Sequence, residues 1–300
     1  MQPFHFLCVS LNVVAIRAKI NITNVAQLYG HKDAIYDFAL DKDEGHLYTV
    51  GADGYVIRWD IHNPKDGLLI IQIGEAIYSI FKSENILRVG SRSGTIYSIN
   101  LKTKTLLGSQ KAHSGGIFFI NDSFSGGEDG NLYIFSTKQK LNVSTKSLRC
   151  CISDNDGYYI GASDTLIYHI DKNTLTVKNR IKGHTNSVFG LSFLDKNTLV
   201  STGRDAQIIV HDLTINVPVH TIFAHTFQAK NLSWNGHILL SCSMDKTIKL
   251  WDSQLNLLKV IDYERYLGHT NCINKTAWID ENMFVSCSDD KSIVFWKIEN

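Results

Sequence analysis

Seven similar segments recur along the 300-residue chain, and this repetition constrains the fold more than any other feature of the sequence. Each segment has a small-residue strand end, a tight turn and then a strand of alternating apolar and polar residues. The turn residues are Asp53, Ser93, Asp129, Asp164, Asp205, Asp245 and Asp290, at intervals of 40, 36, 35, 41, 40 and 45 residues. A period of about 40 residues fits one four-stranded sheet per repeat, which is typical of a β-propeller.

Four copies of the segment are the clearest, because a tryptophan or its substitute follows the turn aspartate by six positions. They are Val50–Asp60, Thr202–Asp212, Cys242–Asp252 and Cys287–Lys297. The weaker copies are Gly90–Asn100, Gly126–Ser136 and Gly161–Asp171. Strand-forming residues alternate with polar ones between glycine, aspartate and asparagine turns, and no stretch shows a sustained helical period. The sequence therefore predicts an all-β fold of seven four-stranded antiparallel blades.

A small residue followed by histidine precedes five of the turns, and two segments end in Trp-Asp. The histidines are His31, His113, His184, His225 and His269, and the Trp-Asp pairs begin at Trp59 and Trp251. Over residues 20–300 this pattern resembles the WD40 family, and as a whole protein the chain resembles its small stand-alone bacterial members. The resemblance implies a single propeller over 20–300. It also implies ring closure by a strand at Ile22–Leu28, paired beside Ser292–Trp296, which would remove an exposed sheet edge.

Residues 1–19 precede the repeats, and we interpret them as an N-terminal extension or a peripheral strand. The apolar stretch Phe4–Val14 has no basic residue before it and is interrupted by His5, Ser10 and Asn12. A signal peptide has a positive start, an unbroken apolar stretch and a small-residue cleavage site. A weak signal and an extended start are the alternatives. No other stretch approaches the roughly 18 apolar residues that span a bilayer, so we expect no membrane segment.

Charge and cysteine content narrow the function classes. Lys plus Arg (30) and Asp plus Glu (29) nearly cancel, which argues against a nucleic-acid binder that relies on bulk positive charge. The six cysteines include no CxxC pair, so neither a zinc knuckle nor a redox motif is indicated. We expect reduced thiols, a cytoplasmic location, no metal and no cofactor.

The WD40 resemblance implies a structural use for the repeat histidines. In this family the histidine bonds to the turn aspartate and to a strand hydroxyl, which in turn reaches the tryptophan indole. The implied sets are His31, Thr49, Asp53 and Trp59; His225, Ser241, Asp245 and Trp251; His269, Ser286, Asp290 and Trp296; His184, Ser201 and Asp205 with His211 in the tryptophan position; and His113, Ser125 and Asp129 with Phe135. The second and fourth blades lack the set, so we expect them to rely on apolar packing and on the neighbouring blades.

These Ser/His/Asp combinations superficially resemble hydrolase triads. One set per blade, each inside its own sheet, cannot form one active site, and the sequence has no GxSxG, HExxH or phosphate-binding glycine loop. We therefore expect no enzymatic activity. A propeller enzyme remains the alternative, and it would need carboxylates or histidines that converge in the channel.

The loops that carry the histidines and turn aspartates lie, by resemblance, on the family's usual interaction face. Five residues after the histidine, or its equivalent, stand Tyr36, Tyr78, Phe118, Phe189, Lys230 and Asn274. Large aromatic side chains are favoured at interfaces, because their burial removes much apolar area from water. The alternative is that these rings only line the channel rim and pack on neighbouring blades.

Further candidates stand just before the turns and in one insertion. Arg92 and Arg204, with Lys230 and the additional candidate Arg149, would clamp carboxylates of a peptide, or else pair with Glu128 and Asp289 across the rim. Met244 holds the same pre-turn position. The insertion Asp262–Leu267 adds binding candidates on the same face, because loops on rigid scaffolds often carry function. They are Tyr263, Arg265 and Tyr266.

The sequence thus favours a monomeric scaffold that binds partner proteins or peptides on one face of the propeller. The alternative function is that of a WD40 subunit associated with nucleic acid. A basic stripe on one face of the propeller would indicate it.

Overall fold

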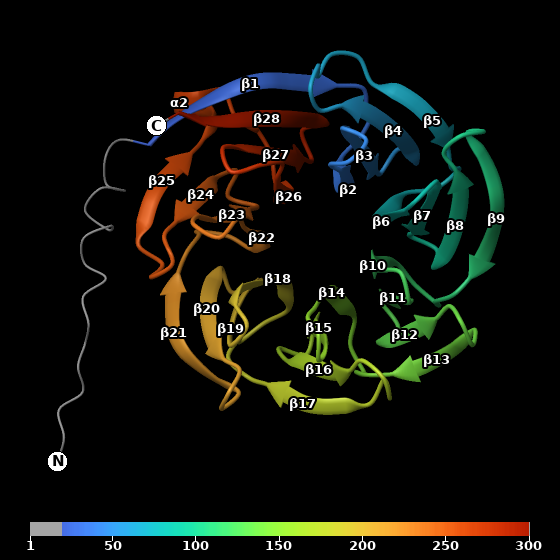
Figure 1. Cartoon of the computed structure of the whole chain (residues 1–300), viewed down its shortest axis with the longest axis vertical. Coiled ribbons are helices and arrows are strands. Elements are labelled where there is room, and N and C mark those ends of the chain that lie inside the picture. The colour runs from blue at the N-terminus through green and yellow to red at the C-terminus, as the bar shows by residue number, and fades with distance from the viewer. Residues whose placement is uncertain (1–19, 300) are drawn as a thin grey trace.

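In a computed structural model, residues 20–299 form a closed ring of seven sheets around a central channel (Figure 1). Each sheet has four antiparallel strands, and in six of the seven these are consecutive in the chain from the channel to the outer rim. The predicted seven-bladed β-propeller is confirmed. The predicted extension over residues 1–19 lies outside the described residues.

The first four blades follow one another in chain order. The first contains β2 (Ile35–Asp41), β3 (His46–Gly51), β4 (Tyr55–Asp60) and β5 (Leu68–Gln72). The second contains β6 (Ile77–Ser83), β7 (Ile86–Ser91), β8 (Thr95–Asn100) and β9 (Thr105–Lys111). The third contains β10 (Ile117–Ile120), β11 (Phe124–Gly127), β12 (Asn131–Ile134) and β13 (Gln139–Asn142). The fourth contains β14 (Leu148–Ser153), β15 (Gly157–Ala162), β16 (Ile167–Asp171) and β17 (Val177–Ile181).

The last three blades complete the ring. The fifth contains β18 (Val188–Asp195), β19 (Thr198–Gly203), β20 (Gln207–Asp212) and β21 (Val217–Phe223). The sixth contains β22 (Ala229–Trp234), β23 (Leu239–Ser243), β24 (Ile248–Trp251) and β25 (Leu257–Ile261). The seventh contains β26 (Ile273–Trp278), β27 (Met283–Ser288), β28 (Ser292–Glu299) and, outermost, β1 (Asn21–Tyr29). The short α2 (Tyr263–Tyr266) precedes β26, and no helix in residues 20–299 is long and apolar enough to cross a membrane.

The turn between the second and third strands explains why the repeat has its sequence form. The residue after each turn residue has a φ between 62° and 88°, at Gly54, Gly94, Gly130, Thr165, Ala206, Lys246 and Lys291. In the first blade, the Asp53 carboxylate accepts the N–H of Tyr55 over 3.0 Å. An aspartate that bonds its own backbone two residues on stabilises this left-handed turn, which explains its preference at the repeat position.

The hydrophobic core lies between the blades. Seven apolar clusters each join side chains from two neighbouring blades. The cluster between the seventh and first blades, for example, buries Phe295 and Val285 against Phe38 and Trp59. Because each sheet buries both faces against its neighbours, every blade depends on the presence of the next one.

The ring closes through β1, which pairs antiparallel with β28 from Asn21 opposite Glu299 to Tyr29 opposite Ser292. Ile22 and Leu28 are buried and enter the apolar clusters on the two sides of the seventh blade. The closing strand expected at Ile22–Leu28 is confirmed.

The closing strand offers a test of how much the ring depends on it. Leu28→Ala removes apolar atoms from the cluster between the seventh and first blades, so the free energy of unfolding should fall by about 2–3 kcal/mol. Val25 lies at the bulge of the same strand and is 49% exposed, so Val25→Ala should leave stability almost unchanged. Equilibrium unfolding in urea measures both, and equal losses would contradict a stabilising role for β1.

Candidate functional site

In the first, sixth and seventh blades, the four implied side chains form one hydrogen-bonded chain. His31 Nδ1 lies 3.0 Å from Asp53 Oδ1, and its Nε2 lies 2.8 Å from Thr49 Oγ1. The Trp59 indole donates to the same hydroxyl over 2.9 Å. The equivalent sets are His225, Asp245, Ser241 and Trp251, and His269, Asp290, Ser286 and Trp296. The histidines, hydroxyls and tryptophans are buried, so these polar groups satisfy one another inside each blade.

The third blade contains a shortened version of this set, and the fifth contains a complete one with histidine in the tryptophan position. In the third, His113 bonds to Asp129 over 2.7 Å and to Ser125 over 2.9 Å, and Phe135 ends the arrangement without a polar atom. The fifth blade joins His184 to Asp205 over 2.9 Å and to Ser201 over 2.7 Å. Its Ser201 hydroxyl lies 2.6 Å from Nε2 of His211, which is completely buried.

The second and fourth blades pack on their neighbours through apolar clusters, as expected, and they also have polar sets that were not expected. Glu75 accepts hydrogen bonds from the Ser93 hydroxyl over 2.8 Å and from the Tyr97 hydroxyl over 2.9 Å. In the fourth blade, Asp164 accepts from the hydroxyls of Ser144 and Tyr168. Glu75 and Asp164 are not marked by the repeat histidine, so a pattern based on histidine could not predict these two substitutes.

The seven innermost strands share a β-bulge at one position. Sheet pairing skips one residue in each, namely Tyr36, Tyr78, Phe118, Arg149, Phe189, Lys230 and Asn274. A bulge frees a residue from the ladder and redirects its side chain. All seven are half-buried and line the cavity at the channel mouth, and we call them the bulge ring.

The bulge ring unites six residues predicted from the sequence with Arg149, which was only an additional candidate. The fourth blade has no repeat histidine, so counting forward from that residue could not place it. In the structure, each ring residue directly follows an apolar residue that is at most 1% exposed. These are Ile35, Ile77, Ile117, Leu148, Val188, Ala229 and Ile273.

Neighbouring members of the bulge ring touch one another. The rings of Tyr36 and Tyr78 meet edge to face at 5.3 Å between centroids, and Tyr78 stacks on Phe118 at 5.8 Å. The Arg149 guanidinium lies 4.2 Å from the centroid of Phe118 and 5.8 Å from that of Phe189. These contacts join the side chains into a continuous aromatic and cationic arc along the innermost strands.

Lys230 extends this arc and Asn274 ends it. The Lys230 ammonium lies 5.2 Å from the centroid of the Phe189 ring, a cation–π contact between the sixth and fifth blades. Asn274 donates to Asp289 over 2.7 Å and to the Ile35 carbonyl over 2.8 Å, which ties the seventh blade to the first.

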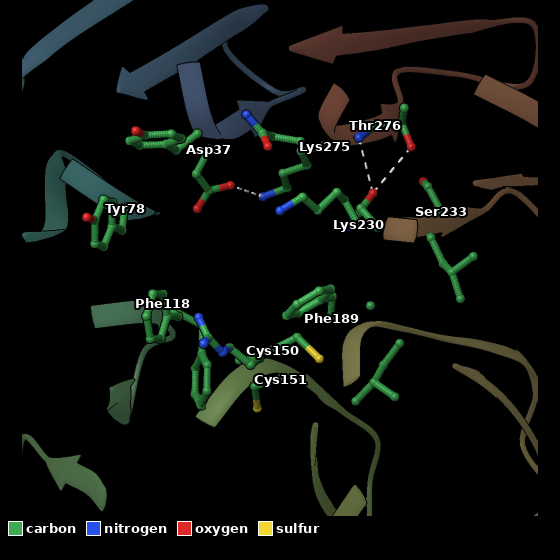
Figure 2. A pocket seen from close by; sticks show the side chains of 18 of the residues that line it. Asp37, Tyr78, Phe118, Cys150, Cys151, Phe189, Lys230, Ser233, Lys275 and Thr276 are labelled. Atoms are coloured by element: carbon green, nitrogen blue, oxygen red, sulfur yellow. Dashed lines mark hydrogen bonds and ion pairs between the residues drawn. The ribbon is translucent and has the colours of Figure 1, made fainter. Parts of the chain in front are cut away.

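The bulge ring surrounds a cavity of about 760 Å³ that continues into the channel. Figure 2 shows Tyr78, Phe118 and Phe189 around this cavity, with Lys230 and Lys275 extending into it. Lys275 donates to Asp37 over 2.6 Å and to the Phe38 carbonyl over 2.9 Å, so its charge is neutralised inside the protein. The cavity is therefore open to a ligand but polar and charged on one side.

Not all of the predicted binding residues join this cavity. Arg204 lines it, whereas Arg92 and Met244 are exposed on the same face outside its lining. The insertion forms α2 beside β1 at the outer rim (Figure 1). There Arg265 pairs with its own helix cap, Asp262, over 2.6 Å, Tyr266 packs on the core and Tyr263 is 50% exposed. The three insertion residues thus lie apart from the bulge ring.

Two cysteine thiols line the cavity without the features of a nucleophile. Burial raises the pKa of the Cys150 thiol to about 12, and burial likewise raises the pKa of the neighbouring Cys151 thiol. A thiol reacts as its thiolate, so both are protonated and weakly nucleophilic near neutral pH. Within residues 20–299, no three His, Cys, Asp or Glu side chains are grouped as metal ligands.

One family model matches the chain, that of the WD40 family, described as WD domain, G-beta repeat. It matches residues 22–60, 175–212, 216–252 and 262–297. These ranges contain all or most of the three inner strands of the first blade and of the last three blades, where the histidine sets are the most complete. The second to fourth blades have the substituted sets or the shortened one.

Curated relatives resemble parts of the chain. A protein named ribosome biogenesis protein WDR12 homolog, from Aedes aegypti, is 29% identical over 119 residues, which are 39% of this chain and 28% of the relative. Protein tipD of Dictyostelium discoideum is 23% identical over 297 residues, which are 89% of this chain and 48% of the relative. The chain thus spans about a quarter to a half of these relatives. They come from an insect and a slime mould and give no support to the expected bacterial resemblance.

A solved structure resembles the whole ring. The crystal structure of the WD40 β-propeller domain of Doa1 superimposes with a TM-score of 0.82, and the match covers 94% of this chain and 98% of that chain. The two sequences are 17% identical, so the likeness concerns the fold alone.

His211 gives a prediction of how stability depends on pH. Burial, assisted by the nearby His184, lowers the pKa of His211 to about 4, and its Nδ1 has no partner in the described part of the chain. In the unfolded chain a histidine titrates near 6.5. Between pH 6.5 and pH 4 this histidine is protonated in the unfolded chain but neutral in the folded protein. Its contribution to the free energy of unfolding is therefore complete above pH 6.5 and declines toward pH 4.

Replacing His211 should therefore flatten the loss of stability in acid. His211→Phe copies Phe135 of the third blade and should reduce the fall in unfolding free energy between pH 7 and pH 5 by about 2 kcal/mol. His220 of the same blade is exposed, and His220→Phe should keep the wild-type pH dependence. Urea unfolding at the two pH values measures the effect, and a wild-type slope in His211→Phe would contradict this reasoning.

Proposed function

This chain belongs to the WD40 family, whose model matches half of its residues, and on that premise we propose that it is a non-enzymatic scaffold that binds partner proteins or peptides. The bulge ring is the observation that carries the proposal. Seven half-buried side chains, four of them aromatic, surround one open cavity on a rigid frame. Aromatic and arginine side chains at the centre of a surface are the residues that contribute most to protein–protein binding.

The arrangement of polar groups favours binding over catalysis. The Ser/His/Asp groups lie one per blade and are engaged in bonds within their own sheets. In the cavity, the carboxylate of Asp37 is paired with Lys275, and the two thiols are protonated. A channel enzyme needs groups that exchange protons near neutral pH, and the groups described do not provide a matched acid and base.

We also propose a monomer that acts in the cytoplasm. A second candidate setting is ribosome biogenesis, because proteins named for that process match 39–40% of this chain. Direct contact with nucleic acid would then be an addition to protein binding, and the near-neutral net charge of +1 does not favour it.

Affinity purification coupled to mass spectrometry tests the scaffold proposal. Tyr78→Ala/Phe118→Ala removes the stacked pair from the bulge ring, and partners that use this face should lose most of their recovery. Leu107→Ala, at an exposed position on the outer strand β9, is the matched control and should keep the wild-type partners. If the folded double variant and the wild type recover identical partners, the bulge ring is not the binding surface.

A further inference from the structure

Three basic side chains from consecutive blades line one side of the cavity without an ion-pair partner. Arg149, Arg204 and Lys230, which we call the cation cluster, come from the fourth, fifth and sixth blades. None of them forms an ion pair within residues 20–299. Arg149 is half-buried, and a charge that has lost part of its hydration without a partner is costly.

The nearest carboxylates are occupied elsewhere. Asp37 binds Lys275 and also accepts the Ile80 N–H over 3.0 Å. Glu128 accepts the Gly116 N–H over 3.1 Å, and Asp289 accepts from the Asn274 amide. The alternative role considered for the arginines, pairing with Glu128 and Asp289 across the rim, is therefore not adopted.

Arg149 is fixed in place and is the most constrained member of the cluster. Its Nε donates to the Ser163 hydroxyl over 2.7 Å, while its plane is held between the rings of Phe118 and Phe189. Burial lowers the pKa of this guanidinium, the negative charge of Glu128 offsets part of that effect, and the positive charge of Arg204 lowers the pKa by a smaller amount. A bound anion would relieve both the lost hydration and the like-charge repulsion.

Resting on the proposed function, we propose that the cation cluster binds a carboxylate of the partner peptide, either an Asp or Glu side chain or a C-terminal carboxylate. Arginine and lysine donors that line one cavity from neighbouring blades suit a carboxylate, and the bond is charge-assisted on both sides. The rings of Phe118 and Phe189 flank Arg149, so they would pack on the residues beside a carboxylate bound there.

A neighbouring loop supplies an apolar contact for the same peptide. At the second position after the repeat histidine, Asp33, Asn186 and Asn271 each bond the next backbone N–H. The sixth blade has Phe227 there instead, 60% exposed, and the adjacent loop carries Met244, 47% exposed. Ser243 donates to the Phe227 carbonyl over 3.2 Å and joins the two loops. An apolar residue near the carboxylate would therefore be favoured.

The charge distribution favours a peptide over a nucleic acid. The cation cluster occupies one part of the ring, whereas Glu75, Glu128 and Asp289 lie in the loops of other blades on the same face. A polyanionic backbone needs a continuous basic path, and these carboxylates would repel it. A single carboxylate flanked by apolar residues fits both the cations and their surroundings.

Selection from a random linear peptide library displayed on phage tests this inference, with synthetic copies of an enriched peptide as the measured probes. The wild-type protein should enrich peptides that carry Asp or Glu near an apolar residue. Replacing that Glu by Gln, or Asp by Asn, should weaken binding about tenfold or more. A copy with an amidated C-terminus distinguishes a terminal carboxylate from an acidic side chain. This comparison uses the wild-type protein and does not depend on the folding of a variant.

Protein variants locate the effect. Arg149→Gln/Lys230→Gln should bind the acidic peptide about tenfold more weakly than the wild type does. It should also bind the acidic peptide and the copy that lacks the carboxylate with equal affinity. Lys102→Gln/Lys104→Gln removes two charges from the loop between β8 and β9, at the opposite end of the blade from the turns, and should behave as the wild type. Thermal unfolding verifies that each variant is folded.

The outcomes separate this inference from the proposed function. Enriched peptides that need Tyr78 and Phe118 but show no preference for acidic residues would overturn the inference and leave the scaffold proposal intact. No enriched peptide, or enrichment that is indifferent to the bulge ring, would overturn both. Binding of a single-stranded RNA oligonucleotide that is lost in Arg149→Gln/Lys230→Gln, without acid-dependent peptide binding, would replace the carboxylate by nucleic acid.

Discussion

The structure depends on burial between the blades, because each sheet is covered by its two neighbours and no blade has a core of its own. This dependence runs around the ring and requires that the first and seventh blades also cover each other. The pairing of β1 with β28 joins the two ends of the described chain in one sheet, and Leu28 packs against the first blade. Asp37 and Lys275 add an ion pair across the same junction beside the channel.

Apolar packing between the blades does not by itself determine where the loops lie on each sheet, and polar side chains fix their positions. The buried histidine, hydroxyl and tryptophan of a blade hold the loop that carries the histidine against the sheet. If one member were missing, its hydrogen-bond partner would lose that bond. The sequence of the set varies, since Glu75 with Ser93 and Asp164 with Ser144 achieve the same link with other atoms. What the fold requires at this place is a satisfied polar chain rather than one particular residue.

The repeat period and the turn aspartates predict the fold almost completely. The period is the length of one four-stranded sheet, and the aspartate marks the left-handed turn between two of its strands. The closing strand follows from the resemblance to the family and from the need to remove a sheet edge. The position of Arg149 was harder to predict, since it depends on a bulge that has no sequence mark of its own in a blade without the repeat histidine. The position of the insertion Asp262–Leu267 at the outer rim could not be predicted, because it depends on tertiary contacts with β1.

The bulges have a consequence for how such a surface can change over time. Each bulge side chain stands outside the ladder of its strand, and the fully buried residue before it carries the packing. Under the proposed function, recognition and the apolar packing between blades occupy adjacent but separate positions in every repeat. A chain of this kind can exchange ring residues and acquire a new partner while the apolar packing between its blades is kept.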